Sequence, residues 1–249
     1  MQAESELYSD SRLLELMNSV HLKETQDQYK ALLQEASESS MSYREFMGRL
    51  LEIENEGRCR KRVERLKKAA NFEFIKSLSD IDYGFNPSLS KNQIEELGTL
   101  DFMSNHENII LIGPPGVGKS MIATGIGLNA CKAERKVLFI NAQDLVDNLC
   151  EEKKKGTLRK YLKRLEKVPL LIIDEMSYLR LDNEKESLFF QVIRGHYEKG
   201  SLIITTNIPL GRWGEMFSSE IAATAILDRL LHHCHVISIT GESYRVKSG

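Results

Sequence analysis

The clearest chemical signal in the sequence is the segment 113–120, which reads GPPGVGKS and fits the pattern GxxxxGK[ST]. It follows an apolar run at 109–112 and precedes a helical pattern, which is the context that a phosphate-binding loop requires. Glycines let the backbone curl so that its amides point at phosphate oxygens, and the positive end of the helix dipole adds to the attraction. A glycine-rich turn without chemical meaning is the alternative, and the flanking strand and helix disfavour it.

Within this loop we expect Lys119 to meet the β and γ phosphates of a nucleotide and Ser120 to hold Mg²⁺. The residues expected to bind the nucleotide are Gly113, Pro114, Pro115, Gly116, Val117, Gly118, Lys119, Ser120 and Met121.

Two carboxylates follow further along the chain, where the apolar run 170–173 ends in Asp174 and Glu175. Such a strand places both at the carboxyl edge of a parallel sheet, the edge at which the phosphate loop also lies. We expect Asp174 to bind Mg²⁺, directly or through water, and Glu175 to polarise the water that attacks the γ phosphate. A solvated acidic turn is the alternative, but two carboxylates after a phosphate loop indicate hydrolysis.

Asn207 ends the next apolar run, at 201–206. A neutral amide there can orient the attacking water or contact the γ phosphate without adding repulsive charge. It can equally be a turn residue before Pro209, and spacing alone does not decide between the two.

The elements that must position these residues change in character along the chain. Residues 1–70 show the 3.6-residue apolar spacing of helices, and Ser42 with Glu45 has the spacing of a capping box. From about residue 105, five short apolar runs alternate with helical patterns at 118–133, 142–166 and 184–198, among others. This alternation predicts an α/β fold with a five-stranded parallel sheet. We therefore expect a small all-helical N-terminal domain at 1–70, a linker with the start of the nucleotide pocket at 71–104, and a nucleotide-binding domain at 105–249.

Composition excludes several classes of protein. The chain has 249 residues, 41% hydrophobic and 28% charged, which are the proportions of a soluble globular protein. No apolar run approaches the roughly 20 residues of a membrane-spanning helix, and no secretion signal is visible, so we expect a cytoplasmic protein without a membrane partner. Four cysteines without a CxxC pair indicate reduced thiols.

The net charge of −2 conceals two basic clusters. Residues 58–68 carry seven basic side chains and one acidic, and residues 153–167 carry eight basic and one acidic. Either cluster could neutralise DNA phosphates, giving salt-sensitive and largely sequence-independent binding. A solvated helix face balanced by nearby acids is the alternative, and for a charge run alone it is favoured.

Taken together, GPPGVGKS, LLIIDE and TTN resemble the motifs of AAA+ ATPases. The segments NPSLSKNQIEELGTLDF, DEMSYL, LIITTNIPLGRWGEMF and AILDRLLHHCHVISITGESYR resemble IstB-like transposition helper ATPases, and the sequence is similar also to DnaC-type helicase loaders. The resemblance is strong over about residues 70–246 and looser before them.

The resemblance implies a Mg-ATP-dependent homo-oligomer in which an arginine of one subunit completes the active site of its neighbour. The matching position is Arg229, whose alternative role is an ordinary surface pair with Asp228. Arg245 is a weaker candidate for sensing nucleotide, since the C-terminal lid of many AAA+ proteins is expected to be reduced or absent here. The resemblance also places DNA contacts between the second strand and the acidic pair, at Lys153, Lys154, Lys155, Arg159 and Lys160.

The resulting hypothesis is an ATP- and Mg²⁺-dependent ATPase that assembles on duplex DNA and assists a transposase in target selection. A helicase loader is the nearest rival, distinguished by single-stranded DNA and a helicase as its partners. An adaptor that binds ATP without turnover is a rival of another class, against which Glu175 argues.

Overall fold

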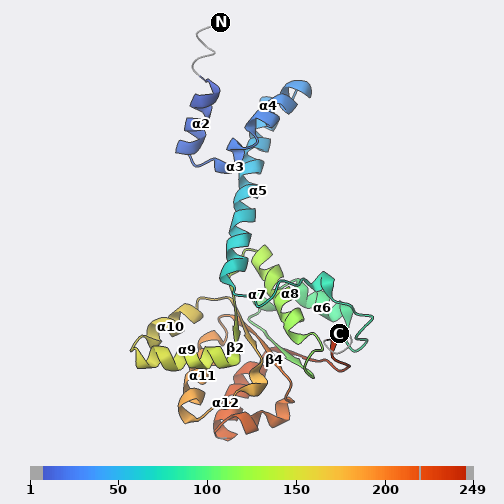
Figure 1. Cartoon of the computed structure of the whole chain (residues 1–249), viewed down its shortest axis with the longest axis vertical. Coiled ribbons are helices and arrows are strands. Elements are labelled where there is room, and N and C mark those ends of the chain that lie inside the picture. Colours follow the sequence, from blue (N-terminus) through green and yellow to red (C-terminus); the bar gives the residue numbers. More distant parts are fainter. Residues whose placement is uncertain (1–7, 219, 245–249) are drawn as a thin grey trace. The chain divides into compact units, whose positions relative to one another are not determined.

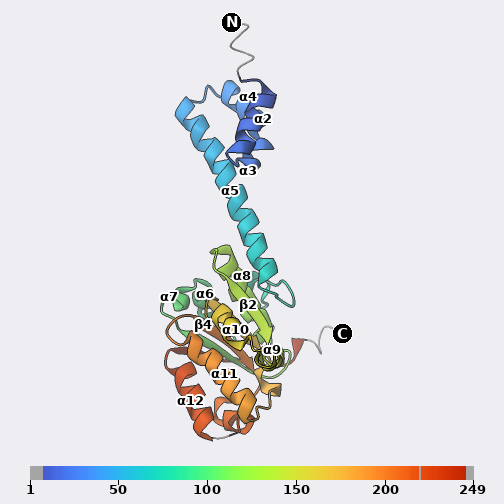
Figure 2. The same cartoon turned by 90° about the vertical axis from the view of Figure 1, so that its left-hand side faces the viewer.

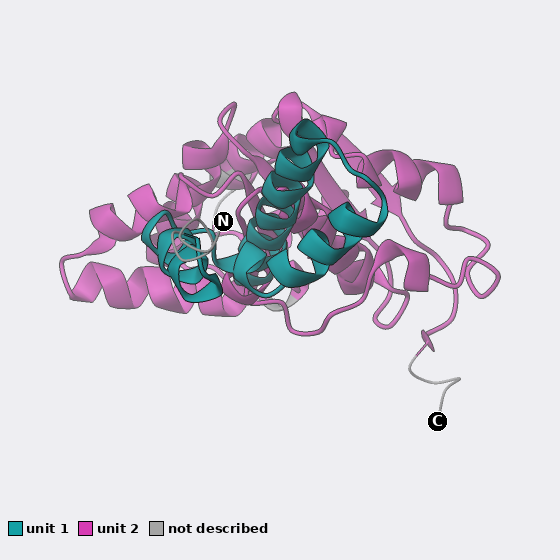
Figure 3. Cartoon of the chain, turned by 90° about the horizontal axis from the view of Figure 1, so that it is seen from above, with its two compact units in different colours: residues 1–65 teal, residues 66–249 magenta. Residues whose placement is uncertain are grey.

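The chain forms two compact units that divide after residue 65 (Figure 3). The structure is a computed structural model, and it describes residues 8–218 and 220–244. Within this part of the chain, none of the helices combines the length and the apolar composition that crossing a bilayer requires.

The first unit is helical, as the sequence predicts. Its helices are α2 (Asp10–Ser19), α3 (Lys23–Gln26), α4 (Tyr29–Glu38) and most of the long α5 (Tyr43–Ala69). Figure 2 shows α2, α3 and α4 gathered beside the N-terminal part of α5. Ser42 precedes α5, and its Oγ accepts a hydrogen bond from the Glu45 amide at 3.2 Å, as half of the expected capping box. The apolar stripe of α2 is not buried, since Leu14 and Val20 are 36% and 60% exposed.

A buried carboxylate joins α3 to α5. Glu54 of α5 is 5% exposed, and its Oε2 accepts hydrogen bonds from the backbone amides of Glu24 at 2.8 Å and Thr25 at 3.1 Å. These amides have no partner within α3, and a negative charge at a helix start also suits the helix dipole. Burial alone raises the pKa of Glu54, but hydrogen bonds from Arg58 and from the two amides outweigh it and keep the pKa below its usual value. Glu54 therefore acts as the cap of α3.

The second unit is built on a five-stranded sheet. Its strands are β1 (Asn108–Ile112), β2 (Val137–Asn141), β3 (Leu170–Asp174), β4 (Ser201–Thr206) and β5 (Cys234–Ser238). Their order is β2-β3-β4-β1-β5, and every neighbouring pair is parallel. Each strand coincides with one of the apolar runs, which confirms the predicted α/β class.

Helices cover both faces of this sheet (Figure 1). They are α6 (Lys91–Gly98), α7 (Asp101–Ser104), α8 (Lys119–Lys132), α9 (Ala142–Lys154), α10 (Leu158–Leu165), α11 (Asn183–His196) and α12 (Glu220–Leu231), with short 3-10 turns η1 (Leu78–Asp80), η2 (Met176–Tyr178) and η3 (Leu210–Met216). Strand β1 shows how alternation builds the two layers. Ile109 and Leu111 belong to the apolar cluster with α6, α7 and α8, whereas Ile110 belongs to the cluster with α9 to α12.

The segment 142–166 differs from the single helix that its pattern predicts. Helix α9 ends at Lys154 and α10 begins at Leu158. Between them Gly156 has φ +72°, in the left-handed region that glycine enters without a steric penalty. The break distributes the basic residues of this segment over two helices.

Candidate functional site

The phosphate loop lies between β1 and α8, at the carboxyl edge of the sheet. Gly116 and Gly118 have φ +82° and +99°, which L side chains rarely adopt, so these turns need glycine. The Lys119 ammonium is held by its own loop, because it donates to the carbonyls of Gly113 at 2.7 Å and Pro114 at 2.8 Å. The loop thus presents a cation and the free amides at the start of a helix, as a phosphate site requires.

Asp174 ends β3 directly opposite the start of α8. Its side chain is almost fully buried, and Oδ1 accepts a hydrogen bond from Ser120 Oγ at 2.9 Å and a short one from the hydroxyl of Thr205. A carboxylate and a hydroxyl in contact form an oxygen donor set that suits Mg²⁺, which takes few protein ligands and fills its shell with phosphate oxygens and water. The residues present therefore fit the metal that the sequence predicts.

Glu175 follows Asp174 in a left-handed conformation, with φ +59°. Its amide donates to Thr205 Oγ1 at 3.0 Å, and its Oε2 accepts a hydrogen bond from Asn141 Nδ2 at 2.9 Å. Asn141 also caps α9, because its Oδ1 accepts from the Gln143 amide at 2.9 Å. Sequence reasoning missed both Thr205 and Asn141. Their position at the ends of β4 and β2 was the available signal, since parallel strands end at one edge.

A small cavity of about 80 Å³ brings together four of the residues predicted for phosphate binding, metal binding and hydrolysis. Lys119, Ser120, Glu175 and Asn207 all line it. Asn207 is positioned by its backbone, whose amide donates to Ser177 Oγ at 2.5 Å. The space is suited to a terminal phosphate and one water molecule beside it.

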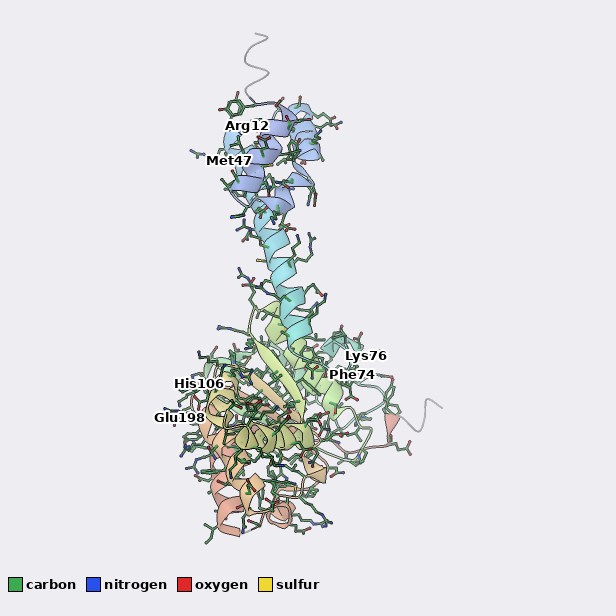
Figure 4. The ribbon with its side chains drawn as sticks, turned by 60° about the vertical axis from the view of Figure 1, so that its left-hand side comes forward. Arg12, Met47, Phe74, Lys76, His106 and Glu198 are labelled. Carbon is green, nitrogen blue, oxygen red and sulfur yellow. The ribbon has the colours of Figure 1, made fainter. Side chains whose placement is uncertain are left out.

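A larger cavity of about 470 Å³ lies on the other side of the loop. Its walls include Phe74, Lys76, Asp80, Ile81, Asp82, Phe85, Asn86, Leu89, Met121 and Tyr244. Figure 4 labels Phe74 and Lys76, which come from the segment between α5 and η1. Of these residues only Met121 was predicted individually. The others lie in the segment 71–104, which was expected to hold the start of the nucleotide pocket, and in the C-terminal part, but no spacing marked them as single residues. A largely apolar, aromatic wall next to a phosphate loop suits a planar base.

The C-terminal segment closes one side of this cavity. The Tyr244 amide donates to the carbonyl of Gly116 at 2.9 Å, and the rings of Tyr244 and Phe85 lie 4.3 Å apart. Arg245, the weaker candidate for nucleotide sensing, lies outside the described residues.

Arg229 lies at the opposite, amino edge of the sheet. It lines a cavity of about 100 Å³ with residues that precede β1 and β4, among them His106 and Glu198, both labelled in Figure 4. Its guanidinium lies 4.8 Å from the centre of the Phe190 ring. In the described part of the chain it forms no ion pair with Asp228 or with another acid. The structure therefore separates Arg229 from the phosphate loop of its own chain.

The basic residues at the end of α9 are exposed and partly paired. Lys153 Nζ lies 2.8 Å from Glu184 Oε1, and Lys155 Nζ lies 2.6 Å from Glu151 Oε1. The hydrogen bond to Glu151 raises the pKa of Lys155. Lys154 is exposed as well.

The basic residues of α10 have different surroundings. Arg159 and Lys160 lie around an open groove with three further cations, Lys163, Arg164 and Lys167. Across the residues that the structure describes, none of the five forms an ion pair. The predicted set of five DNA contacts is thus divided, and the groove adds three cations to it, Lys163 and Arg164 on α10 and Lys167 just after it.

Comparison with known proteins adds independent findings. Residues 15–249 match the family model described as "IstB-like ATP binding protein". The chain is 38% identical over 232 residues to an "Insertion sequence IS21 putative ATP-binding protein" of Pseudomonas aeruginosa, covering 93% of this chain and 88% of that protein. It is 39% identical to the counterpart from IS5376 of Geobacillus stearothermophilus, covering 95% and 94%. Among solved structures, AMPPCP-bound DnaA from Aquifex aeolicus has a TM-score of 0.57 at 20% identity over 68% of this chain and 51% of that one, a likeness of fold.

Proposed function

The chain belongs to the family of IstB-like ATP-binding proteins and is an ATPase with the AAA+ P-loop fold, and we propose that it assembles on duplex DNA to assist a transposase. The insertion-sequence relatives support the transposase as partner, because they are named as ATP-binding proteins of such elements. The observation that carries the DNA assignment is the group of five cations on and just after α10 that lack acidic partners in the described structure.

We propose that hydrolysis takes place in the small cavity beside Lys119. Lys119 exchanges the carbonyls of its own loop for the β and γ phosphates, and Glu175 accepts a proton from the attacking water while Asn207 orients that water. Ser120 and Asp174 would hold Mg²⁺, which when bound neutralises charge on the phosphates.

Assembly follows from the position of Arg229 in this proposal. An arginine at the far edge of the sheet can serve only the nucleotide of another copy, where it would stabilise charge on the γ phosphate. ATP would then bridge neighbouring copies on DNA, and its hydrolysis would loosen them.

DNA binding by α10 can be tested with a double substitution, Arg159→Ala with Lys160→Ala. Binding to a duplex is measured over a range of salt concentrations with ATP and with ADP. If each cation neutralises one phosphate, the slope of log K against log salt becomes shallower by about 2. The matched control is Lys91→Ala with Lys199→Ala, which removes the same charge from exposed positions elsewhere on this unit. Equal losses in both variants, or no loss in the α10 variant, would contradict the assignment.

The choice of partner is tested in the same assay. Preference for duplex over single-stranded DNA, together with ATP-dependent co-purification of a transposase of the same element, supports the transposition role. Preference for single-stranded DNA and capture of a replicative helicase would support a helicase loader instead.

A further inference from the structure

Asn86 carries a buried donor that the fold leaves unused. Its side chain is 4% exposed, and within the described structure Nδ2 has no hydrogen-bond partner. The opposite end of the amide is occupied, because Oδ1 accepts from the Ser88 backbone amide at 3.1 Å and lies 2.7 Å from Ser88 Oγ. A backbone N–H can only donate, so the oxygen must face Ser88 and the NH₂ group must face away from it.

The surroundings hold this amide in place. Ser88 Oγ is tied to the segment after β5, since it accepts from the Thr240 amide at 3.1 Å and lies 2.8 Å from the Thr240 carbonyl. Gly241 covers the amide closely, because a Cβ on that glycine would lie 3.4 Å from Asn86 Oδ1 and 3.5 Å from Nδ2. Asn86 is thus fixed between two segments of the chain.

Asn86 also lines the larger cavity beside the phosphate loop. A buried donor without an acceptor is unfavourable, and native proteins rarely leave one unless a ligand or water supplies the acceptor. The cavity has aromatic and aliphatic walls at Phe74, Ile81 and Phe85, which suit a flat heterocycle. The two cavities share Gly116, Lys119 and Ser120, but Glu175 and Asn207 line only the smaller one and the aromatic residues line only the larger one, so base and terminal phosphate have separate places.

We propose that the Asn86 side-chain amide donates a hydrogen bond to a ring nitrogen of adenine and thereby holds the base of the bound nucleotide. The assignment deepens the proposed function and rests on its nucleotide site, but not on DNA or on a transposase. Adenine offers three ring acceptors, N1, N3 and N7, each of which is deleted in the corresponding deaza analogue of ATP.

The test is equilibrium binding by calorimetry, without DNA, to the full chain and to Asn86→Ala. The ligands are ATP, 1-deaza-ATP, 3-deaza-ATP, 7-deaza-ATP and inorganic tripolyphosphate. We expect Asn86→Ala to weaken ATP about three- to tenfold and to leave tripolyphosphate unchanged. One deaza analogue lacks the nitrogen that accepts from Asn86. Its affinity for the parent protein should equal the affinity of Asn86→Ala for ATP, and the substitution should not weaken this analogue further. Asn105→Ala, an exposed asparagine of the same unit, should bind every ligand as the parent does.

Three results would overturn the proposal. One is unchanged ATP binding in Asn86→Ala, which would mean that water alone satisfies the donor. The second is an equal loss for ATP and tripolyphosphate, which would indicate a structural role. The third is a parent protein that binds all three deaza analogues as tightly as ATP, a result that needs no variant to fold. Failure of DNA binding would leave these measurements unaffected.

Discussion

At the scale of single residues, Thr205 links the two carboxylates of the site. Its hydroxyl donates to Asp174 and accepts from the amide of Glu175, and its side chain is 1% exposed. One hydroxyl therefore fixes both the residue expected to hold the metal and the residue expected to activate water. Thr205 touches neither reacting atom, so it is a positioning residue.

Replacing Thr205 by Val keeps the shape and removes the hydroxyl. The partly buried amide of Glu175 then lacks its acceptor, and the buried Asp174 loses one donor, which should cost about 1–3 kcal/mol of stability. We expect the variant to lower kcat at least tenfold and to need more Mg²⁺ for half-maximal turnover, with a smaller change in ATP affinity. Thr205→Ser, which retains the hydroxyl, should stay close to the parent. A Val variant with unchanged kcat and Mg²⁺ dependence would show that the link is dispensable.

The sequence predicts residues that belong to a motif but not those that support it. Lys119, Asp174 and Glu175 are recognisable because spacing along the chain reflects their chemistry. Thr205 and Asn141 act through contacts between the ends of neighbouring strands. The residue spacing within one strand does not indicate which side chains of the neighbouring strand it will contact. Asn86 lies in the segment expected to start the nucleotide pocket, but its own role becomes visible only from the cavity beside it.

At the scale of elements, the glycines of α8 allow the segment before η1 to approach the helix. A Cβ on Gly125 would lie 2.9 Å from the backbone nitrogen of Leu78, and one on Gly127 would lie 2.8 Å from the Phe72 ring. The backbone of Leu78 cannot move away from an added Cβ as easily as the end of a flexible side chain can. Because residues 74–82 line the larger cavity, the surface of α8 helps to define the shape of the nucleotide pocket.

Gly125→Ala should therefore displace this segment. We expect a loss of about 1–3 kcal/mol in the free energy of unfolding, measured in urea, and weaker ATP binding. Gly211→Ala is the matched control, because a Cβ there meets nothing within 4 Å, and it should leave both quantities near the parent values. Normal stability and ATP binding in Gly125→Ala would mean that the segment can move without consequence.

Helices and strands could be predicted wherever the periodic spacing of apolar residues reflects their burial in the core. All five strands and α8 follow from it, since β1 to β4 and α8 are largely buried and β5 contributes Ile237 to the core. The break at Gly156 did not follow, because the apolar pattern continues across it and only the backbone conformation changes. The stripe of α2 predicted a helix correctly, yet periodicity cannot tell whether a partner covers it within the chain.

At the scale of the whole molecule, the sheet separates the phosphate loop from Arg229. The loop follows β1, whereas Arg229 lines a cavity among residues that precede β1 and β4. A strand of five residues spans about 16 Å, which is beyond the reach of one side chain. If Arg229 takes part in hydrolysis, as proposed, it must act on a second copy.

Mixing two inactive variants tests this arrangement. Arg229→Ala should bind ATP normally but turn it over at least tenfold more slowly, and Lys119→Ala should fail to bind it. In a mixture, the intact loop of the first variant can meet the intact arginine of the second, so ATPase activity should reappear with DNA present. A mixture as inactive as its components would argue against action between copies.

The double role of Asn141 connects distant parts of the second unit. This one side chain caps α9 and also holds the carboxylate of Glu175, while the other end of α9 leads through Gly156 into the cationic helix α10. A force on α10 that displaces α9 along its axis must stretch one of two hydrogen bonds, the one from Asn141 to Glu175 or the one from Gln143 to Asn141. The orientation of the Glu175 carboxylate is consequently linked, through one side chain, to the start of the helix whose other end leads to the cationic surface.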